Sequence, residues 1–354
     1  MGKQDKKVLV FMLTRRGCLA YATPLVEQLR QEVPLRVYTS AYATERLPKD
    51  SIPIKTYRSG FEFFWNSLVR LPLFLWQLRR VFQQGYKTAY FPLFHPWNWW
   101  IMHWCKWWGL RIVFTVHDGV PHQGEQSLGA FRLRKWCIQS SDQLIFLSHF
   151  VQQQVTERYT FRGKATVIPH GIVHPSSLRK IPRQLPQKRV RLLFSGRLSA
   201  YKGLDLLLDA MAQLTADPRL TLTVAGMPIN GYQLPTLPEN TKVIAKWLAE
   251  EELAKLLQEH NISILPYIEA SQSGVIPLGI AAGLPMICTK VGGLPEQLTK
   301  EEAVWVAPEV DSLVTGIKQL ASDPILYADL HQKMLAKQAT LSWEAVAQKV
   351  ATFL

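Results

Sequence analysis

Residues 190–203, VRLLFSGRLSAYKG, place an apolar run directly before a short loop that holds two glycines and two cations. The run VRLLF predicts a buried strand, and LDLLLDAMAQL after Gly203 has helical spacing. Glycines let a backbone approach a ligand closely, and the first amides of a helix point at bound anions. Because Arg197 and Lys202 lie five residues apart in this loop, the stretch indicates either a solvated polar turn or an anion site.

The same order, a short apolar run and then a helical pattern, recurs along the whole chain. The runs are KVLVFML, LRVYT, TAYFPLF, LRIVFTV, QLIFLS and ATVIP in the first half, and VRLLFSG, LTLTVAG, TKVIAKW, ISILPY, PMICT and AVWVA in the second. Helical patterns lie around residues 21–32 and from Phe150. This alternation is typical of an α/β fold with parallel sheets covered by helices on both faces.

The basic, Pro-rich segment HPSSLRKIPRQLPQKR (174–189) interrupts the alternation and predicts a linker. We therefore expect a first domain at 1–173, a second at 190–341, and a last helix at 342–354 that could cross back to the first domain. Two doubly wound, Rossmann-like domains facing across a cleft would bind a ligand between them, at the carboxyl ends of the strands.

Composition narrows the class of protein. The chain has 354 residues, 47% of them hydrophobic and 19% charged, as in a globular protein of two domains. Its four cysteines are scattered, without disulfide or zinc spacing, which favours a reduced, cytoplasmic setting. The start MGKQDKKVLVFML lacks the pattern of a signal peptide, and prolines and histidines break the longest apolar run, Thr88–Cys105, so we expect no membrane span.

Positive charge and tryptophan gather in the first half. Residues 1–178 hold 23 of the 41 Lys/Arg but 10 of the 27 Asp/Glu, and nine of the twelve tryptophans. The segments FEFFWNSLVRLPLFLWQLRRVF (61–82), which Pro72 could divide, and PWNWWIMHWCKWWGLR (96–111) are either helices packed deep in the domain or helices at a membrane interface. We favour the interface, which predicts an anionic membrane surface as partner, a lipid-linked acceptor, and a peripheral location on the inner face of the cell membrane.

Two further loops of the second half follow predicted strands. AGMPINGYQ (225–233) begins with a glycine, Gly226, that would let a base or sugar approach. In EASQSGVIPLGIAAGLP (269–285), polar residues open a helix, and the amides of Gly274 and Val275 would suit a phosphate. Ordinary serine capping is the alternative. Two anion sites on neighbouring strand ends suit a diphosphate better than a single phosphate.

In the first half, FTVHDGVPH (114–122) ends a strand with His117, which could donate to a ligand hydroxyl. The spacing of its histidines fits no standard zinc site, so we predict no metal. The first strand ends in Thr14-Arg15-Arg16-Gly17, where a nucleotide-facing loop would lie. Donor, acceptor and structural roles stay open for Arg15, Arg16, His95, Asp118, His122 and His170.

Taken in order, these motifs carry a resemblance. GRLSAYKG, a strand ending in AG, ASQSGV, GLP and VGGLPE (291–296) resemble the donor domain of the family-4 retaining glycosyltransferases with the GT-B fold, and VHDGVPH and IPHGI (168–172) are similar to motifs of that family's first domain. The resemblance covers nearly the whole chain and is strongest from 168 to 297. It implies transfer of a sugar from a nucleotide-diphosphate sugar, such as a UDP- or GDP-sugar, with no cofactor.

By position, the resemblance implies that Arg197 and Lys202 bind the donor diphosphate and stabilise the leaving group, and that His117 contacts the transferred sugar. The remaining donor-binding residues would be Gly17, Gly196, Gly226, Glu269, Gln272, Ser273, Gly274, Val275 and Glu296. It also implies retention without an enzymatic nucleophile: the leaving phosphate oxygen takes the acceptor's proton, and neither a carboxylate pair nor a metal is required.

The sequence departs from the family pattern at one position. The family commonly has two glutamates separated by seven residues, and Pro277 stands where the second, ribose-holding glutamate would follow Glu269. We interpret this as an ASQSGV-type variant of the motif. Two other functions are a nucleotide-sugar epimerase or hydrolase on the same fold, and a nucleic-acid-binding protein suggested by the pI near 9.6. The last is disfavoured because no nucleic-acid-binding module is present.

Overall fold

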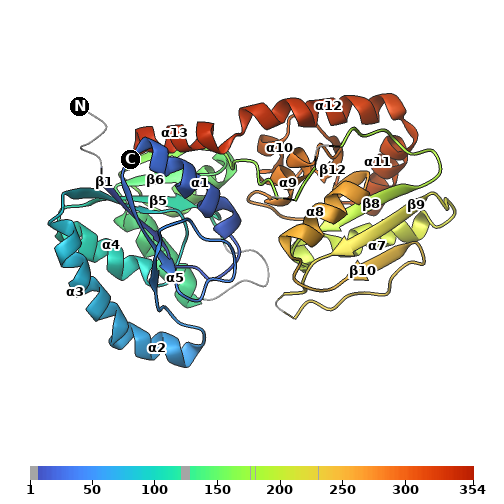
Figure 1. Ribbon diagram of the computed structural model, residues 1–354. Helices are drawn as coiled ribbons and strands as arrows, with labels where there is room; N and C mark the ends of the chain where they lie inside the picture. Colours follow the sequence, from blue (N-terminus) through green and yellow to red (C-terminus); the bar gives the residue numbers. More distant parts are fainter. Residues whose placement is uncertain (1–6, 121–127, 176, 180, 230) are drawn as a thin grey trace. The chain divides into compact units, whose positions relative to one another are not determined.

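The computed structural model describes residues 7–120, 128–175, 177–179, 181–229 and 231–354 and divides the chain into two compact units (Figure 1). The first unit falls within Met1–Val120, Ser127–Gly171 and Ser342–Leu354. The second contains Ile172–Leu341. Each unit has its own sheet and its own buried core.

The first unit is built on a seven-stranded parallel sheet of order β3-β2-β1-β4-β5-β6-β7. Its strands are β1 (Lys7–Met12), β2 (Leu35–Ser40), β3 (Ile52–Ile54), β4 (Tyr86–Phe91), β5 (Arg111–Val116), β6 (Gln143–Phe146) and β7 (Lys164–Val167). The chain winds outward from β1 to β3, then returns and winds the other way from β4. The order therefore reverses between β1 and β4, and ligands of doubly wound sheets bind outside the carboxyl ends of the strands at such a point.

The described residues of this unit form the helices α1 (Leu19–Glu32), α2 (Gly60–Leu68), α3 (Arg70–Phe82), α4 (Asn98–Trp107), α5 (Leu128–Ser140), α6 (His149–Arg158) and α13 (Trp343–Phe353). Alternate residues of β1 feed two cores, because successive side chains of a strand point to opposite faces. Val10 packs with α1 and α13, which lie side by side, and Phe11 packs with α3, α4, α5 and α6 (Figure 1).

The second unit repeats the architecture with a six-stranded parallel sheet of order β10-β9-β8-β11-β12-β13. Its strands are β8 (Val190–Ser195), β9 (Leu220–Ala225), β10 (Thr241–Ile244), β11 (Ile262–Leu265), β12 (Met286–Thr289) and β13 (Val304–Val306). The order reverses between β8 and β11. The loops that follow these two strands therefore share one edge of the sheet, at its switch point.

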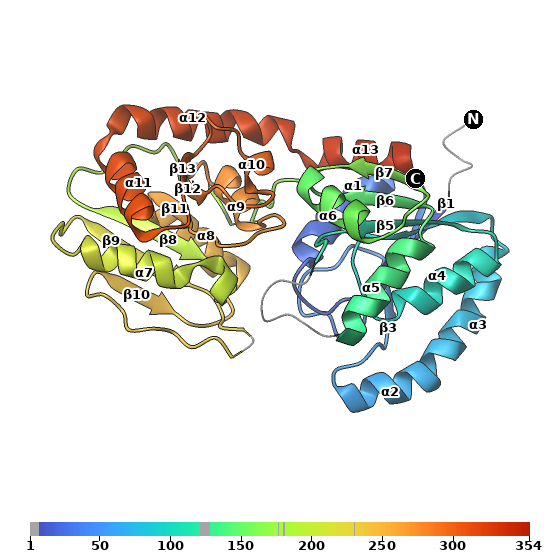
Figure 2. The ribbon, with the colours of Figure 1, turned by 180° about the vertical axis from the view of Figure 1, so that it is seen from behind.

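The helices in the described part of this unit are α7 (Leu204–Gln213), α8 (Glu250–Glu259), α9 (Val275–Ala281), α10 (Leu294–Gln297), α11 (Val310–Ser322) and α12 (Pro324–Thr340). Figure 2 shows α7 and α11 on one face of the sheet, where they bury Phe194. Leu193, its neighbour on β8, packs on the other face with α8 and α9. Both parallel sheets are thus buried on two sides, as their apolar strands require.

Three features differ from expectation. The short edge strand β3 was not predicted, because IPI offers too few residues for a periodic signal. The helical segment 61–82 is divided at Val69, and Pro72 lies in the first turn of α3, where its missing N–H leaves no bond unmade. The predicted linker belongs to the second unit, since the Arg183 guanidinium donates to the carbonyls of Leu257, His260 and Ala282.

Among the described residues, no helix combines the length and the apolar character needed to cross a bilayer.

Candidate functional site

The ends of the neighbouring strands β8 and β9 are each followed by a glycine that the local backbone requires. Gly196 has φ +121° and leads the chain out of the strand. At Gly226, on the neighbouring strand end, φ is +156°, and a Cβ atom would lie 1.7 Å from the carbonyl oxygen of Gly196. Any side chain at Gly226 would therefore push the two strand ends apart.

Arg197 and Lys202 are fixed by aromatic residues. The Arg197 guanidinium donates to the Tyr201 hydroxyl, with Nη2 and Oη 3.1 Å apart. Lys202 is only 9% exposed, and its Nζ lies 3.6 Å from the centroid of the Tyr267 ring, as in a cation–π pair. Both cations therefore stand at the carboxyl-terminal edge of the sheet, Lys202 between the loops that follow β8 and β11.

The loop after β11 is held by Ser273. Its hydroxyl bonds with the hydroxyl of Tyr267 at 3.0 Å and accepts from the backbone N–H of Val275 at 3.2 Å. The side-chain amide of Gln297, on α10, accepts from the Ser273 N–H at 2.7 Å and donates to the Ser273 carbonyl at 3.0 Å. Ser273 thus joins three segments and fixes the turn that precedes α9.

The two amides expected at this turn differ from each other. Gly274 is exposed, and a Cβ atom there would meet nothing within 4 Å. The Val275 N–H, in contrast, is already bonded to the Ser273 hydroxyl. In this structure the Val275 amide is therefore bonded within the turn, whereas Gly274 is exposed, and a phosphate contact of either amide stays a prediction.

Several buried polar atoms of these loops make no hydrogen bond within the part of the chain that the structure describes: Ser199 Oγ, Glu269 Oε2 and Gln272 Oε1. Buried polar atoms are normally paired, so a cluster of such atoms at one edge of a sheet calls for a ligand or ordered water. Glu296, on α10, is exposed. Pro277 is buried in α9.

The first unit has a cavity of about 150 Å³ at the corresponding edge of its own sheet. Its polar lining residues are Thr14, Arg16, Cys18, Thr115, His117, Asp118 and Arg134. They come from the ends of β1 and β5 and from α5. Three predicted residues, Arg16, His117 and Asp118, are therefore brought together here.

His117 is oriented by its neighbours. Its Nε2 donates to the Pro92 carbonyl at 2.9 Å, and the Tyr21 ring packs edge-on against it at 4.8 Å. Burial alone would lower the pKa of His117, but the Cys18 thiol, the Pro92 carbonyl and the Asp118 carboxylate together raise it above its ordinary value. The imidazole is thus held by the Pro92 carbonyl at Nε2 and by the Cys18 thiol, which also hydrogen-bonds to the ring.

The other predicted residues of the first half do not line this cavity. Arg15 turns away from it and donates from Nη1 to the Arg58 carbonyl at 3.1 Å, and the Gly17 N–H donates to Glu45 at 2.8 Å. His95 is 5% exposed, and burial lowers its pKa to about 3. His170 packs between Tyr21 and Trp343, and burial lowers its pKa to about 4.

His122 lies outside the described residues. In the described ranges, no group of three or more His, Cys, Asp or Glu side chains is arranged to hold a metal ion.

Sequence reasoning missed the residues that position the predicted ones. Tyr201, Tyr267 and Gln297 orient the cations and Ser273, whereas Cys18 and Arg134 line the first cavity. Tyr201 and Tyr267 each stand at a strand-end loop, and that placement was the available signal. Gln297 gave none, because it contacts Ser273 from 24 residues away.

Two family models match the chain, one in each unit. Residues 17–174 match Glycosyltransferase Family 4, and residues 189–323 match Glycosyl transferases group 1. Together they contain the strand-end loops of the second unit and most residues that line the cavity of the first.

Curated relatives and solved structures agree with these matches. The chain is 23% identical over 222 residues to the phosphatidylinositol N-acetylglucosaminyltransferase gpi3 subunit of Schizosaccharomyces pombe, covering 61% of this chain and 48% of that protein. It therefore spans about half the length of this relative. Sucrose-phosphate synthase from Thermosynechococcus elongatus superposes with a TM-score of 0.77 at 18% identity, covering 98% of each chain.

A second structure, Anabaena HepE in complex with UDP and glucose, superposes with a TM-score of 0.73 at 16% identity, covering 98% of this chain and 99% of that one. At such identities the likeness shows the fold. Each of the two units thus matches a glycosyltransferase family model, the first unit that of family 4, and the chain has the GT-B fold of these solved structures.

Proposed function

We propose that this protein is a retaining, metal-independent glycosyltransferase that moves a sugar from a nucleotide-diphosphate sugar to a lipid-linked or membrane-associated acceptor in glycan or glycolipid biosynthesis. The observation that carries the proposal is the edge of the second sheet, where Arg197 and the largely buried Lys202 stand among unbonded polar atoms. Two fixed cations complement the charge of a diphosphate, and the HepE structure, with UDP and glucose, favours a UDP-sugar as the first donor to test.

In this reaction the bond from the anomeric carbon to the diphosphate breaks, and the acceptor oxygen bonds to the same face of that carbon. The acceptor's proton passes to the departing phosphate oxygen. Arg197 and Lys202 stabilise the negative charge that develops on the diphosphate, and the loss of such a contact costs roughly 100- to 1,000-fold in rate. We assign His117 to a hydroxyl of the transferred sugar.

The unbonded atoms of the β11 loop suit the rest of the donor. Gln272 Oε1 and Glu269 Oε2 are acceptors that sugar or ribose hydroxyls can satisfy. Because Pro277 replaces the family's second glutamate, we propose that Glu269 takes part in holding the ribose. The Gly274 amide and the exposed Glu296 complete the proposed donor site, together with the glycines that shape the strand ends.

We further propose that the enzyme works in the cytoplasm, at the inner face of the cell membrane, without a cofactor and without nucleic acid as a partner. The supporting observation is the basic, tryptophan-rich first half, whose excess charge lies beside apolar segments and suits an anionic bilayer.

A thermal-shift panel of UDP, GDP, ADP and their sugar conjugates tests the donor site. A bound nucleotide raises the melting temperature of the wild type by mass action. The double variant Arg197→Ala with Lys202→Ala should lose that shift, whereas Lys318→Ala, an exposed lysine on α11, should keep it. A folded wild type that responds to no nucleotide would contradict the proposal.

Acceptor turnover is the second arm of the test. An acceptor whose mass increases by one sugar in the presence of the donor supports transfer. Consumption of the donor with no glycosylated product would instead support the epimerase or hydrolase.

A further inference from the structure

The largest gathering of exposed apolar side chains in the described structure lies on α2 and α3. Its members are Phe61, Phe64, Trp65, Leu68, Val69, Leu73 and Trp76, which are between 40% and 80% exposed. We call them the α2–α3 apolar face. The first four are spaced as one side of α2, Val69 lies at the junction of the two helices, and Leu73 and Trp76 are spaced as one side of α3. Single exposed apolar residues are ordinary, but a contiguous set of this size marks an interaction surface.

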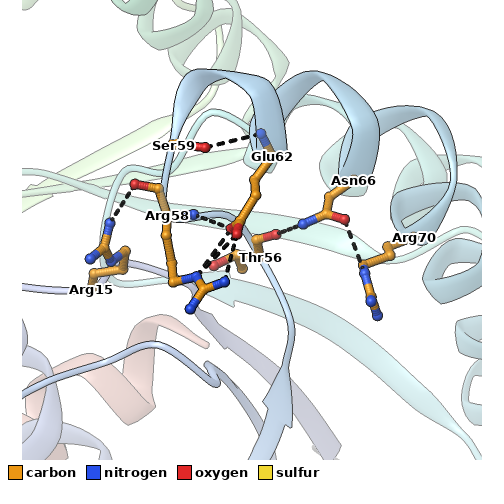
Figure 3. A network of polar contacts seen from close by, with 7 residues as sticks. All are labelled: Arg15, Thr56, Arg58, Ser59, Glu62, Asn66 and Arg70. Carbon is orange, nitrogen blue, oxygen red and sulfur yellow. Dashed lines mark hydrogen bonds and ion pairs between the residues drawn. The ribbon is translucent and has the colours of Figure 1, made fainter.

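Polar contacts on the other side of α2 hold the helix so that the α2–α3 apolar face points outward. Ser59 caps the helix by accepting from the Glu62 N–H, and the Glu62 carboxylate binds the Arg58 guanidinium at 2.7 Å. Asn66, which is 5% exposed, donates to the Thr56 carbonyl at 2.6 Å and accepts from the Arg70 Nε at 3.0 Å. Figure 3 shows this polar network along the inner side of the helix. The exposed apolar residues are therefore presented by a defined structure.

The packing of α3 leads to the same orientation. Leu71, Phe74 and Leu78 are buried in the core, and Trp97, fully buried, donates from Nε1 to the Ser67 hydroxyl at 2.8 Å. In contrast, most tryptophans of α4 pack against that core. Of the two segments suspected of lying at a membrane, 61–82 presents a broad apolar surface, whereas 96–111 is largely structural.

The charges around the α2–α3 apolar face indicate what kind of partner binds there. Residues 56–82 contain four arginines and one glutamate, and that glutamate is paired with Arg58. Arg79 and Arg80 are exposed, and the Arg80 guanidinium stacks over the Trp76 ring at 5.5 Å. A second copy of the chain would bring like charges together across a two-fold interface. Aromatic residues interleaved with arginines suit the boundary between acyl chains and anionic headgroups.

We propose that the α2–α3 apolar face docks this protein on an anionic lipid bilayer. A direct contact then relates the docked helix to the cavity of the same unit. Arg15 donates to the Arg58 carbonyl, at the start of α2, and its neighbours Thr14 and Arg16 line the cavity (Figure 3). Docking thus sets the cavity beside the headgroup layer. A lipid headgroup in that layer would carry the acceptor of the sugar. This last inference, unlike the docking itself, rests on the proposed function.

Co-sedimentation of the full chain with vesicles of phosphatidylcholine containing about one third phosphatidylglycerol tests the proposal. The variant Phe64→Gln with Trp65→Gln and Leu68→Gln changes only exposed side chains, so its core is preserved. It should bind these vesicles about tenfold or more weakly than the wild type. The control Trp247→Gln with Ile325→Gln removes exposed apolar side chains from the second unit and should bind as the wild type does.

A charge variant adds a second arm. Arg79→Gln and Arg80→Gln should each weaken binding about fivefold at low salt, and much less with phosphatidylcholine alone. The proposal is overturned if the wild type does not sediment with the anionic vesicles, if the triple variant binds unchanged, or if the triple variant instead abolishes a concentration-dependent dimer. The nucleotide thermal shift should be the same in the triple variant and the wild type, so failure of docking and failure of donor binding give separate results.

Discussion

The side-chain amide of Gln297 bonds to both backbone polar groups of Ser273, at 2.7 Å to its nitrogen and 3.0 Å to its carbonyl oxygen. The pair fastens α10 to the turn that opens α9. Ser273 also bonds to Tyr267, whose ring lies against the Lys202 ammonium. Gln297 is therefore linked to Lys202 through Ser273 and Tyr267.

Replacing Gln297 by Ala should disturb the donor loop. Two partly buried backbone groups lose their partners, which costs about 1–3 kcal/mol, and the nucleotide-induced thermal shift should shrink. Gln338→Ala is a matched control, since Gln338 donates to the Ile280 and Ala281 carbonyls at the far end of α9. Gln338→Ala should lower the free energy of unfolding but leave the nucleotide-induced thermal shift unchanged. Equal nucleotide responses in both variants would remove Gln297 from the site.

Gly226→Ala should be strongly destabilising. Its Cβ would lie 1.7 Å from the Gly196 carbonyl oxygen, and the residue has a positive φ that alanine rarely adopts. We expect a loss of about 2 kcal/mol or more in the free energy of unfolding, together with loss of the nucleotide shift. Gly60→Ala, whose Cβ would meet nothing within 4 Å, is the control and should change stability little. An unchanged melting temperature for Gly226→Ala would contradict the close approach of the two strand ends.

Acid should destabilise the first unit through His95. Its pKa in the folded protein is about 3, so between about pH 6.5 and 3 the unfolded chain binds a proton that the folded chain does not. The contribution of His95 to the stability is therefore fully present above about pH 6.5 and falls by about 1.4 kcal/mol for each pH unit below it. His170, whose pKa burial lowers to about 4, adds a loss of the same sign in both proteins compared below. His117 acts in the opposite direction, since its raised pKa favours the folded state at low pH and that contribution is lost as the pH rises through the folded value.

Urea unfolding followed by tryptophan fluorescence measures the pH dependence of the first unit's stability. Ten of the twelve tryptophans lie in that unit: nine precede residue 178, and the tenth is Trp343. His95→Gln retains an acceptor for the Trp97 N–H, which His95 Nδ1 now accepts at 3.2 Å. Between about pH 7 and pH 5.5 the variant should lose about 1–2 kcal/mol less than the wild type. Parallel pH profiles for the two proteins would contradict a neutral, buried His95.

Trp343→Ala should weaken the attachment of α13. The Trp343 ring packs against those of Tyr21 and His170, both at 5.6 Å, and a Cβ at Gly171 would lie 2.6 Å from it. Removing this half-buried side chain should cost about 2 kcal/mol. Trp107→Ala, at a tryptophan 82% exposed, should stay within about 0.5 kcal/mol of the wild type. Equal losses measured by urea unfolding would show that Trp343 contributes no packing.

The sequence predicted what local pattern determines. Apolar runs and helical spacing gave the two parallel α/β units, and strand-end position brought attention to Arg197, Lys202 and His117. Packing between residues far apart in the chain could not be predicted from the sequence. The tryptophans of α4 look interfacial by composition, yet most are partly buried and pack against the core. His95 and His170 look reactive by type, yet both are buried among aromatic rings. Residue types and spacing do not reveal which face of a helix is covered.

The return of α13 to the first unit has a consequence for synthesis. The chain leaves that unit after Gly171 and re-enters it at Ser342, so the second unit is an insertion within the first. Val346 and Val350 of α13 are almost fully buried in the first unit's core. During translation the first unit therefore lacks part of its core until these residues leave the ribosome, and the unit that is synthesised first is completed last.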